Sequence, residues 1–323
     1  MRLIRFNKNF FRFLGPLLFI FILWKVGNVS SLVDLILSAN PLPLIITAIL
    51  SCLILFLKVL RWTFLLKSQG HIYKLKKACI AVASSTFLGV VTPSRIGDLM
   101  RVQFIKQDLG VPYTKGLSVS IMDKLCDLYV LILFVVIGIS YLEINHESIN
   151  IILILNFSII FFLFASVFFF FSTSTKGILK WILPSLIFKK WVNIQRKFVD
   201  SMRSQIKPAI FVAIPVTILV YLMGFFQGWL IAQSIEIDIS FFEVISLISI
   251  TSLLGLLPIS ISGFGIREFI FSIYFPTLGY TIEQGIVYGL LVSLFLYLLY
   301  ALIGFISWQL FPFDIGKNAN SKY

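Results

Sequence analysis

One stretch of this chain places charged residues directly after a break in an apolar run. It reads TFLGVVTPSRIGDLMR over residues 86–101, with Pro93 at the break and Arg95 just beyond it. Proline removes a backbone donor and disfavours helical geometry at the preceding residue, so one helix is expected to end here and another to begin. Gly97 allows close backbone approach. An arginine beside the free N–H groups of a helix start is suited to binding a phosphate or a carboxylate.

Two further charges in this stretch can organise that arginine. Asp98 and Arg101 lie three residues apart, a spacing at which side chains can pair on a helix. Charges inside apolar sequence cost free energy, and for that reason they usually mark a site. The alternative is structural, with Asp98 capping a helix and both arginines extending to lipid headgroups.

A second broken run, LPISISGFGIREF at residues 257–269, ends on Arg267 and Glu268. The break is predicted from three residues that interrupt helices, Pro258, Gly263 and Gly265. The freed backbone groups can bond to two nearby hydroxyls, those of Ser260 and Ser262. Arg267 is the only basic residue between Lys207 and Lys317, which argues against chance placement. Adjacent residues on a helix do not face each other, so Arg267 and Glu268 are not expected to pair directly, although they can anchor the hairpin.

A third charged cluster, Asp123, Lys124 and Asp127, lies at the start of another apolar run. Asp123 and Asp127 are four residues apart and share one helix face. Their candidate partners are the arginines of the neighbouring runs, Arg61, Arg95 and Arg101. A structural ion-pair network and a substrate contact both fit this pattern.

The composition is that of a membrane protein with several spans. Hydrophobic residues make up 59% of the 323 and charged residues 13%, and the mean hydropathy is +0.99. The formal net charge of +13 comes from Lys and Arg clustered between apolar runs. This is typical of loops that face anionic lipid, and it argues against a nucleic-acid partner. The three cysteines and two histidines show no metal or disulfide spacing, so we expect no metal and no other cofactor.

About six apolar runs approach the ~20 residues that a membrane-crossing helix needs. They are Phe13–Val33, Leu42–Leu66, Gly116–Leu142, Ile151–Phe171, Pro208–Ala232 and Gln284–Leu310. Two shorter runs are each followed by a short, partly apolar second leg. The first is Ala78–Thr92 with Ile96–Ile105, and the second is Val244–Pro258 with Gly265–Phe275.

The loop charges predict how these runs are oriented. Basic clusters lie on both sides of Ala78–Thr92, so the first short run is expected to enter and leave on the cytoplasmic side. The acidic loop Tyr141–Asn150 is predicted to lie outside. Lys176–Lys207, with eight basic residues and one acid, is predicted to contact anionic lipid at the cytoplasmic surface. Acids precede the second short run, which places its start outside. Both termini are then cytoplasmic, and the protein is a multi-pass protein of the inner (plasma) membrane.

These patterns predict an all-α polytopic membrane protein with about six full spans and two re-entrant hairpins in inverted-topology repeats. Residues 1–323 form a single membrane domain. Within it, 42–142 is the first repeat, 143–207 is a bridging span with a basic cytoplasmic segment, and 208–311 is the inverted second repeat. Non-helical backbone at membrane depth is tolerated only when it is buried in protein or lines a cavity.

The successive segments RWTFLLKSQG, FLGVVTPSRIGDLMR, SIMDKLCDLYVL and LLPISISGFGIREF resemble a flippase-like family. This family is built on the transmembrane region of lysylphosphatidylglycerol synthases and includes archaeal relatives linked to lipid-linked glycan assembly. The resemblance covers the chain from about the second span onward. It implicates ten positions: Pro93, Arg95, Gly97, Asp98, Asp123, Asp127, Gly263, Gly265, Arg267 and Glu268.

The chain departs from the family pattern at two places. It has Asp98 where the family more often has Glu, and Asp123–Lys124 where an acid is followed by Arg. The bifunctional synthases also carry a large soluble aminoacyl-transfer domain after the membrane part. Because this sequence ends at Tyr323, a few residues after the last span, lysyl transfer by this polypeptide is not expected.

The leading hypothesis is therefore translocation of an anionic phospholipid or lipid-linked intermediate between leaflets. The expected substrate-binding residues are Arg95, Arg267, Asp98, Glu268, Arg101, Asp123 and Asp127, and those expected to shape the hairpins are Pro93, Gly97, Pro258, Gly263 and Gly265. No catalytic residue is assigned. A membrane-embedded headgroup transferase and a scaffold for envelope glycan biosynthesis are the alternatives. A homo-oligomer and a partner in envelope biosynthesis both remain open.

Overall fold

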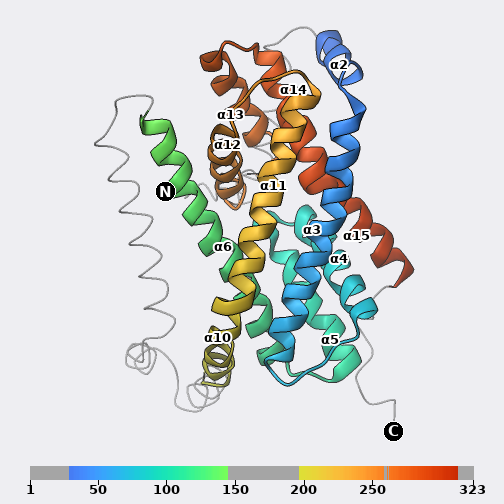
Figure 1. Ribbon diagram of the computed structural model, residues 1–323. Helices are drawn as coiled ribbons and strands as arrows, with labels where there is room; N and C mark the ends of the chain where they lie inside the picture. Colours follow the sequence, from blue (N-terminus) through green and yellow to red (C-terminus); the bar gives the residue numbers. More distant parts are fainter. Residues whose placement is uncertain (1–28, 145–195, 258–259, 261, 312–323) are drawn as a thin grey trace, which may run out of the picture.

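A computed structural model describes residues 29–144, 196–257, 260 and 262–311 of the chain (Figure 1). Every element that it describes is helical, which confirms the all-helical prediction. Three described segments are long and apolar enough to cross a membrane, Pro41–Lys67, Ile206–Ser234 and Ile282–Leu310. Helices suit this environment because they satisfy their own backbone hydrogen bonds in lipid.

The first part of the described chain contains five α-helices and one 3-10 helix. The elements are α2 (Val29–Leu37), α3 (Pro41–Lys67), α4 (Leu75–Val91), the 3-10 helix η2 (Pro93–Met100), α5 (Arg101–Leu109) and α6 (Tyr113–Ile144). α3 begins where its sequence predicts, because Asn40 accepts a hydrogen bond from Leu42 N and Pro41 occupies the first turn.

The second part of the described chain contains six α-helices, one 3-10 helix and two π-helical turns. The elements are α10 (Ile206–Pro208), the π-helix η3 (Ala209–Ala213), α11 (Ile214–Ser234), α12 (Phe241–Leu254), α13 (Ile266–Tyr274), the 3-10 helix η4 (Phe275–Leu278), α14 (Ile282–Ser293), the π-helix η5 (Leu294–Leu298) and α15 (Leu299–Leu310). α12 and α14 both start with capping boxes, Ser240 with Glu243 and Thr281 with Gln284.

The predicted spans agree with the helices wherever the structure describes them. Leu42–Leu66 corresponds to α3, Gly116–Leu142 to α6, Pro208–Ala232 to α11 and Gln284–Leu310 to α14 through α15. Other predictions lie wholly or largely outside the described residues: Phe13–Val33, Ile151–Phe171, most of Lys176–Lys207, Pro258 and both termini.

The two broken runs form hairpins in opposite halves of the molecule. Figure 1 shows α4 and α5 in the lower half and α12 and α13 in the upper half. The predicted single leg Ile96–Ile105 is corrected, because η2 and α5 divide it at Arg101. A 3-10 turn fits here because Gly97 packs so closely on α4 that a Cβ would overlap the Leu88 carbonyl.

Each hairpin packs against the last span of the other half of the chain. α4 lies along α15, α12 lies along α6, and the long helices α3 and α11 pack on each other. Glycines allow both hairpin contacts. A Cβ on Gly138 of α6 would lie 2.6 Å from Ser246 Cα, and one on Gly304 of α15 would overlap the Ala83 carbonyl. Small residues serve this purpose between membrane helices because they let backbones approach.

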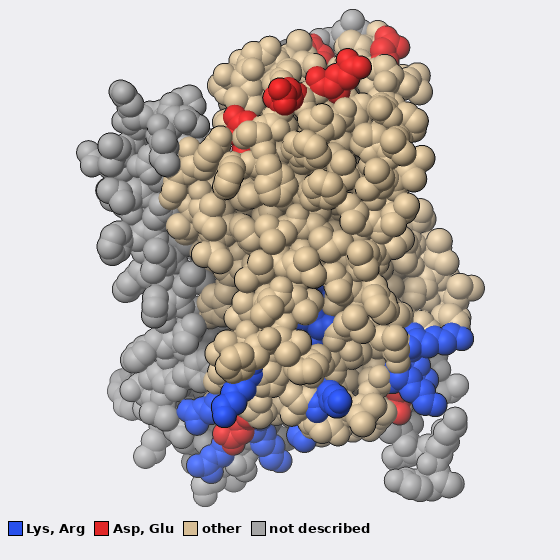
Figure 2. Space-filling model, in the orientation of Figure 1, with Lys and Arg blue, Asp and Glu red and all other residues tan. Residues whose placement is uncertain are grey.

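The exposed basic side chains gather at one end of the molecule. Figure 2 shows Lys and Arg at the lower end, where α3 ends and α4 begins, together with a few acidic side chains, whereas the charged side chains visible at the upper end are acidic. Among the described basic residues at the lower end are Lys67, Lys74 and Lys76, and the upper end includes Glu236 and Glu243. Between the two ends, Figure 2 shows a wide band with few charged side chains, as expected for a membrane-crossing protein.

Candidate functional site

Arg61 of α3 is the centre of a buried ion-pair network that joins three helices. Its Nε donates to Asp123 Oδ1 at 2.7 Å, and its Nη1 donates to Asp127 Oδ1 at 2.6 Å. Nη1 also donates to the Thr217 hydroxyl of α11 at 2.5 Å. The helix face shared by Asp123 and Asp127 therefore turns towards α3, and Arg61 is the partner that both carboxylates share. A buried arginine keeps its charge here because carboxylates and a hydroxyl surround it.

Arg101 completes this network from the first hairpin. Its Nη1 donates to Asp123 Oδ2 at 2.9 Å, and its Nε donates to the main-chain carbonyl of Asp98 at 2.8 Å. The expected side-chain pair between Asp98 and Arg101 is therefore wrong. The Asp98 carboxylate instead accepts a hydrogen bond from Lys124 of α6. Tertiary packing explains this pairing, because α6 places an acid and an amine against the hairpin. Asp123 bonds to Arg101, and Lys124 bonds to Asp98.

Arg95 lies at the hairpin tip with its guanidinium largely unused. Its φ angle of 55° is left-handed, a conformation that costs a non-glycine residue free energy. Its Nε is 3.5 Å from Asp98 Oδ2, too long for a hydrogen bond, and is buried without a described hydrogen-bond partner. The backbone N–H groups of the following turn are already bonded, Arg95 N to Thr92 O and Gly97 N to Thr92 Oγ1. The expectation of free N–H groups for an anion at this helix start is therefore wrong.

The second hairpin uses its arginine in another way. Arg267 and Glu268 are fully buried, and Ser293 joins them: Arg267 Nη1 donates to Ser293 Oγ at 2.7 Å, which donates to Glu268 Oε1 at 2.6 Å. Glu268 Oε2 accepts from Gly265 N at 2.6 Å, so this helix start is also occupied by the chain itself. Gly263 and Gly265 have φ angles of 82° and 86°, which explains the glycines at the break.

Tyr297 of η5 connects the arginines of the two hairpins. The guanidinium carbon of Arg267 lies 4.1 Å from the centre of the Tyr297 ring, and that of Arg95 lies 5.9 Å from the same centre. The hairpins also touch directly, because Ser262 Oγ donates to the Val90 carbonyl at 2.8 Å. The two broken runs, far apart in sequence, therefore meet at one place in the molecule.

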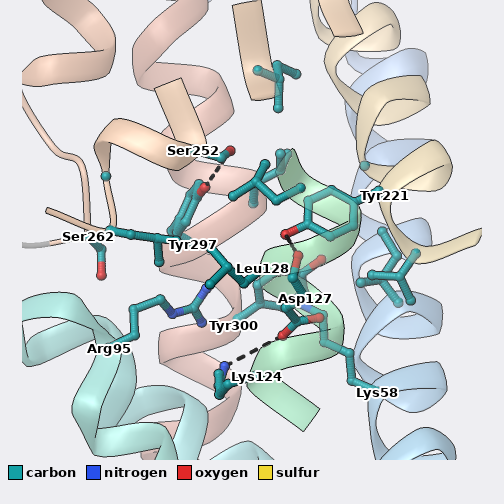
Figure 3. Close-up of a pocket in the computed structure, with 18 of the residues that line it drawn as sticks. Lys58, Arg95, Lys124, Asp127, Leu128, Tyr221, Ser252, Ser262, Tyr297 and Tyr300 are labelled. Atoms are coloured by element: carbon teal, nitrogen blue, oxygen red, sulfur yellow. Dashed lines mark hydrogen bonds and ion pairs between the residues drawn. The ribbon is translucent and has the colours of Figure 1, made fainter. Parts of the chain in front are cut away.

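A cavity of about 520 Å³ opens beside this meeting point (Figure 3). Both halves of the chain line it, through α3, η2 and α6 on one side and α11, α12 and η5 on the other. Its polar lining is Lys58, Arg95, Lys124, Asp127, Tyr221, Gln227, Ser252, Ser262, Tyr297 and Tyr300. Most of the remaining lining is apolar. Ile96 also lines the cavity and is 64% exposed, so the cavity reaches the surface beside η2.

Only part of the predicted site reaches this cavity. Arg95 and Asp127 line it, whereas Arg267 and Glu268 are closed off behind Tyr297. The other three predicted residues, Asp98, Arg101 and Asp123, are buried supports that hold α6, α3 and the hairpin together. In the described part of the chain, no group of three His, Cys, Asp or Glu side chains could hold a metal ion.

Comparison with known proteins identifies the family of this chain. Residues 12–304 match the family model described as "Lysylphosphatidylglycerol synthase TM region". The chain belongs to this family. It is also 25% identical over 334 residues to UPF0104 membrane protein MJ1595 of Methanocaldococcus jannaschii, covering 98% of this chain and 99% of that protein. The resemblance inferred from the broken-helix segments is confirmed, and the protein is a membrane protein of the synthase TM-region family.

The sequence patterns of this family member did not single out Lys58, Tyr221, Tyr297 and Tyr300 as site residues. Lys58 could have been found, because it is the first charge in the apolar run from residue 42. The tyrosines carry no such signal. An apolar span contains many aromatic residues, and only tertiary packing shows which of them face a cavity.

Proposed function

We propose that this protein moves an anionic lipid, or a lipid-linked intermediate, between the leaflets of the inner membrane. The observation that carries the proposal is a pair of cations, Arg95 and Lys58, that face an otherwise largely apolar cavity without a hydrogen-bonded carboxylate among the described residues. An ionised group inside a membrane is costly unless it is paired, so a bound anion would stabilise both.

The supports of the cavity give each charge a role in this proposal. Arg95 and Lys58 contact the phosphate, and Lys124 lies beside them, held by Asp98 and 3.7 Å from Asp127. Arg267 acts indirectly by stacking on Tyr297, which places the ring against the Arg95 side of the cavity. The remaining predicted residues, Glu268, Arg101, Asp123 and Asp127, hold these groups in position.

The apolar part of the cavity suits the rest of a lipid. Lining side chains such as Leu99, Leu125 and Leu128 offer dispersion contacts to acyl chains. The opening beside Ile96 would let the chains remain in the bilayer while the headgroup enters. A water-soluble anion would gain nothing from such walls, so the arrangement favours a lipid.

Alternating access would come from two inverted repeats, 42–142 and 208–311. The packing supports this: α3 with α11 are equivalent first spans, and α4 with α15 mirrors α12 with α6. Rocking one repeat against the other would open the cavity first to one leaflet and then to the other. The basic lower end would face the cytoplasm, with both termini on that side, in agreement with the positive-inside rule.

A leaflet-resolved assay in proteoliposomes tests this proposal. Wild-type protein should exchange a labelled anionic phospholipid between leaflets faster than empty vesicles, and Arg95→Ala should lose most of this gain. The matched control is Arg203→Ala, which removes an exposed arginine of the lower end and should leave exchange unchanged. Equal exchange by wild type and Arg95→Ala would reject the proposal.

The same vesicles separate transport from headgroup chemistry. Their lipids should keep their original masses after incubation, because the proposal involves no covalent step. A new lipid species that depends on the protein would reject the proposal in favour of a membrane-embedded transferase.

A further inference from the structure

The charges around the cavity do not balance. Six basic side chains lie on the cavity or directly behind it in the described residues: Lys58, Arg61, Arg95, Arg101, Lys124 and Arg267. In the same described part of the chain, four acidic side chains accompany them: Asp98, Asp123, Asp127 and Glu268. This leaves an excess of two positive charges in a part of the protein that lies at membrane depth.

Most of these charges are neutralised by ion pairs among the same ten side chains. The remaining pairs show which cations carry the two excess positive charges. Asp123 and Asp127 neutralise Arg61 and Arg101. Asp123 forms ion pairs with both arginines, and Asp127 forms one with Arg61. Lys124 bonds to Asp98. Through Ser293, Glu268 accompanies Arg267. After these ion pairs are assigned, two of the six cations have no carboxylate of their own.

Those two cations are Arg95 and Lys58. The carboxylate oxygen nearest to Arg95 Nε, at 3.5 Å, belongs to Asp98 and is already bonded to Lys124. Lys58 makes no hydrogen bond or close ion pair with any described residue, and its ammonium lies 5.5 Å from the centre of the Tyr300 ring. Both side chains line the cavity (Figure 3). The two uncompensated charges are therefore the two that a ligand can reach.

We infer that the cavity selects a lipid phosphomonoester, whose headgroup carries two negative charges, over singly charged phosphodiesters and over headgroups with added amines. The inference rests on the proposed function in taking the cavity as the lipid site. A dianion neutralises both Arg95 and Lys58, whereas a phosphodiester leaves one buried cation uncompensated. A zwitterionic headgroup brings its own ammonium and gains still less.

The donor geometry fits the same group. Arginine offers a fork of N–H donors and lysine an ammonium with three, while a phosphomonoester presents three terminal oxygens to them. A phosphodiester has only two such oxygens. Nearby cations also favour the doubly ionised form of a phosphomonoester, because an opposite charge stabilises the charged state. A lipid esterified with lysine has two ammonium groups against one phosphodiester charge, and the excess cations would repel it.

The cavity volume supports a lipid as the source of this phosphate. About 520 Å³ lies within the range of ligand sites, roughly 300–1,000 Å³, and exceeds the needs of a phosphate alone. Because apolar side chains form most of the wall, the extra space suits glycerol and the upper part of an acyl chain. The opening at Ile96 leaves the rest of the chain outside.

Lipid binding to the purified full-length protein tests the inference. Native mass spectrometry would compare phosphatidic acid, phosphatidylglycerol, phosphatidylethanolamine and lysylphosphatidylglycerol with identical acyl chains. Phosphatidic acid should bind at least about tenfold more tightly than phosphatidylglycerol, and lysylphosphatidylglycerol should bind most weakly. Equal or stronger binding of phosphatidylglycerol would overturn the inference.

A charge variant makes the test specific. Lys58→Gln removes one of the two excess charges, so the preference for phosphatidic acid over phosphatidylglycerol should fall to about twofold or less. Lys58→Arg keeps the charge and should keep the preference, and a thermal-stability measurement shows that both variants fold. An unchanged preference in Lys58→Gln would overturn the inference.

Two further measurements complete the test. One distinguishes a lipid phosphate from a soluble phosphate, and the other distinguishes this inference from the proposed function. Glycerol 3-phosphate and inorganic phosphate should compete only at far higher concentrations than the lipid, and competition at equal concentrations would overturn the assignment to a lipid. Binding selectivity is measured without leaflet exchange. Selection of phosphatidic acid without exchange would therefore reject the proposed function alone, whereas exchange with no selectivity would reject this inference alone.

Discussion

The two broken hairpins carry the same kinds of residues and use them in different ways. In the first, Arg95 points its guanidinium to the cavity and makes no hydrogen bond to a described residue. In the second, Arg267 bonds to Ser293 Oγ at 2.7 Å and stacks on Tyr297 at 4.1 Å. One arginine is available to a ligand, whereas the other has become part of the structure.

The difference shows what decides whether a buried arginine is available to a ligand or stabilises the protein itself. Arg267 has an acid, a hydroxyl and an aromatic face arranged around it, so its charge is compensated inside the protein. Arg95 has Asp98 nearby, but Lys124 has already bonded to that carboxylate. A buried polar network that is fully satisfied adds rigidity, and one that is left unsatisfied favours binding of a partner.

The largest loss of stability is expected when the supporting arginine, Arg267, is removed. Arg267→Ala leaves Glu268 buried without its cation, and such a change should cost about 3–5 kcal/mol of stability. Thermal unfolding in detergent measures the loss. Arg203→Ala, at an exposed position, should change stability by less than about 0.5 kcal/mol. A stable Arg267→Ala protein that has lost only lipid exchange would make Arg267 a ligand contact instead.

The proposed equivalence of the two repeats predicts matched losses of stability for two glycine substitutions, one at each hairpin contact. Gly138→Ala forces a Cβ against Ser246 of α12, and Gly304→Ala forces one against Ala83 of α4. Each should destabilise by about 1–3 kcal/mol because the backbones must separate. Gly224→Ala has open space around the new Cβ and should be neutral or stabilising. A large cost at only one of the two contacts would argue against equivalent repeats.

Removing Arg95, the proposed ligand-binding arginine, should have the opposite effect on stability. Arg95→Gly relieves the left-handed φ of 55° and removes a charge that has no hydrogen-bonded carboxylate among the described residues, so stability should rise by about 1 kcal/mol. Lipid exchange should fall to the level of empty vesicles in the same protein. Gain of stability with loss of exchange sharpens the contrast with Arg267, and loss of both would contradict it.

The smallest effect is expected far from the cavity, at the loop that precedes the first hairpin. Tyr73 Oη donates to Asp108 Oδ2 at 2.6 Å, and Tyr73→Phe should cost about 1 kcal/mol at neutral pH. Burial, and then this hydrogen bond, raise the pKa of Tyr73. The contribution is therefore present below the unfolded-state pKa of about 10 and is lost as the pH rises through the folded-state pKa. A stability difference between wild type and Tyr73→Phe that grows with pH would contradict this.

Local sequence rules predicted the helices and their breaks but not the pairing of charges. Pro93, Gly97, Gly263 and Gly265 act within a few residues of their own positions, so their effect on the backbone could be inferred from spacing. The partners of Arg101 and Asp98 come from α6, which is more than twenty residues away, and no local rule places them.

The helix starts show the same limit. Free N–H groups were expected at the first break, but Thr92 accepts a hydrogen bond from Gly97 N there, and Glu268 accepts one from Gly265 N at the second break. A hydroxyl or carboxylate close in sequence competes with a ligand for these donors, so motifs that contain both are poor evidence for an anion at the backbone. What remains available is decided by side chains such as Lys58, whose surroundings depend on how distant helices pack.

The proposed function and the proposed lipid selectivity both require that a lipid headgroup lie beside Arg95 and Lys58. Electron cryomicroscopy of the full-length protein in nanodiscs that contain phosphatidic acid would locate it. We predict headgroup density within hydrogen-bonding distance of both Arg95 and Lys58, with Arg267 still bonded to Ser293. A headgroup bound to Arg267, or a cavity that holds acyl chains alone, would contradict the account.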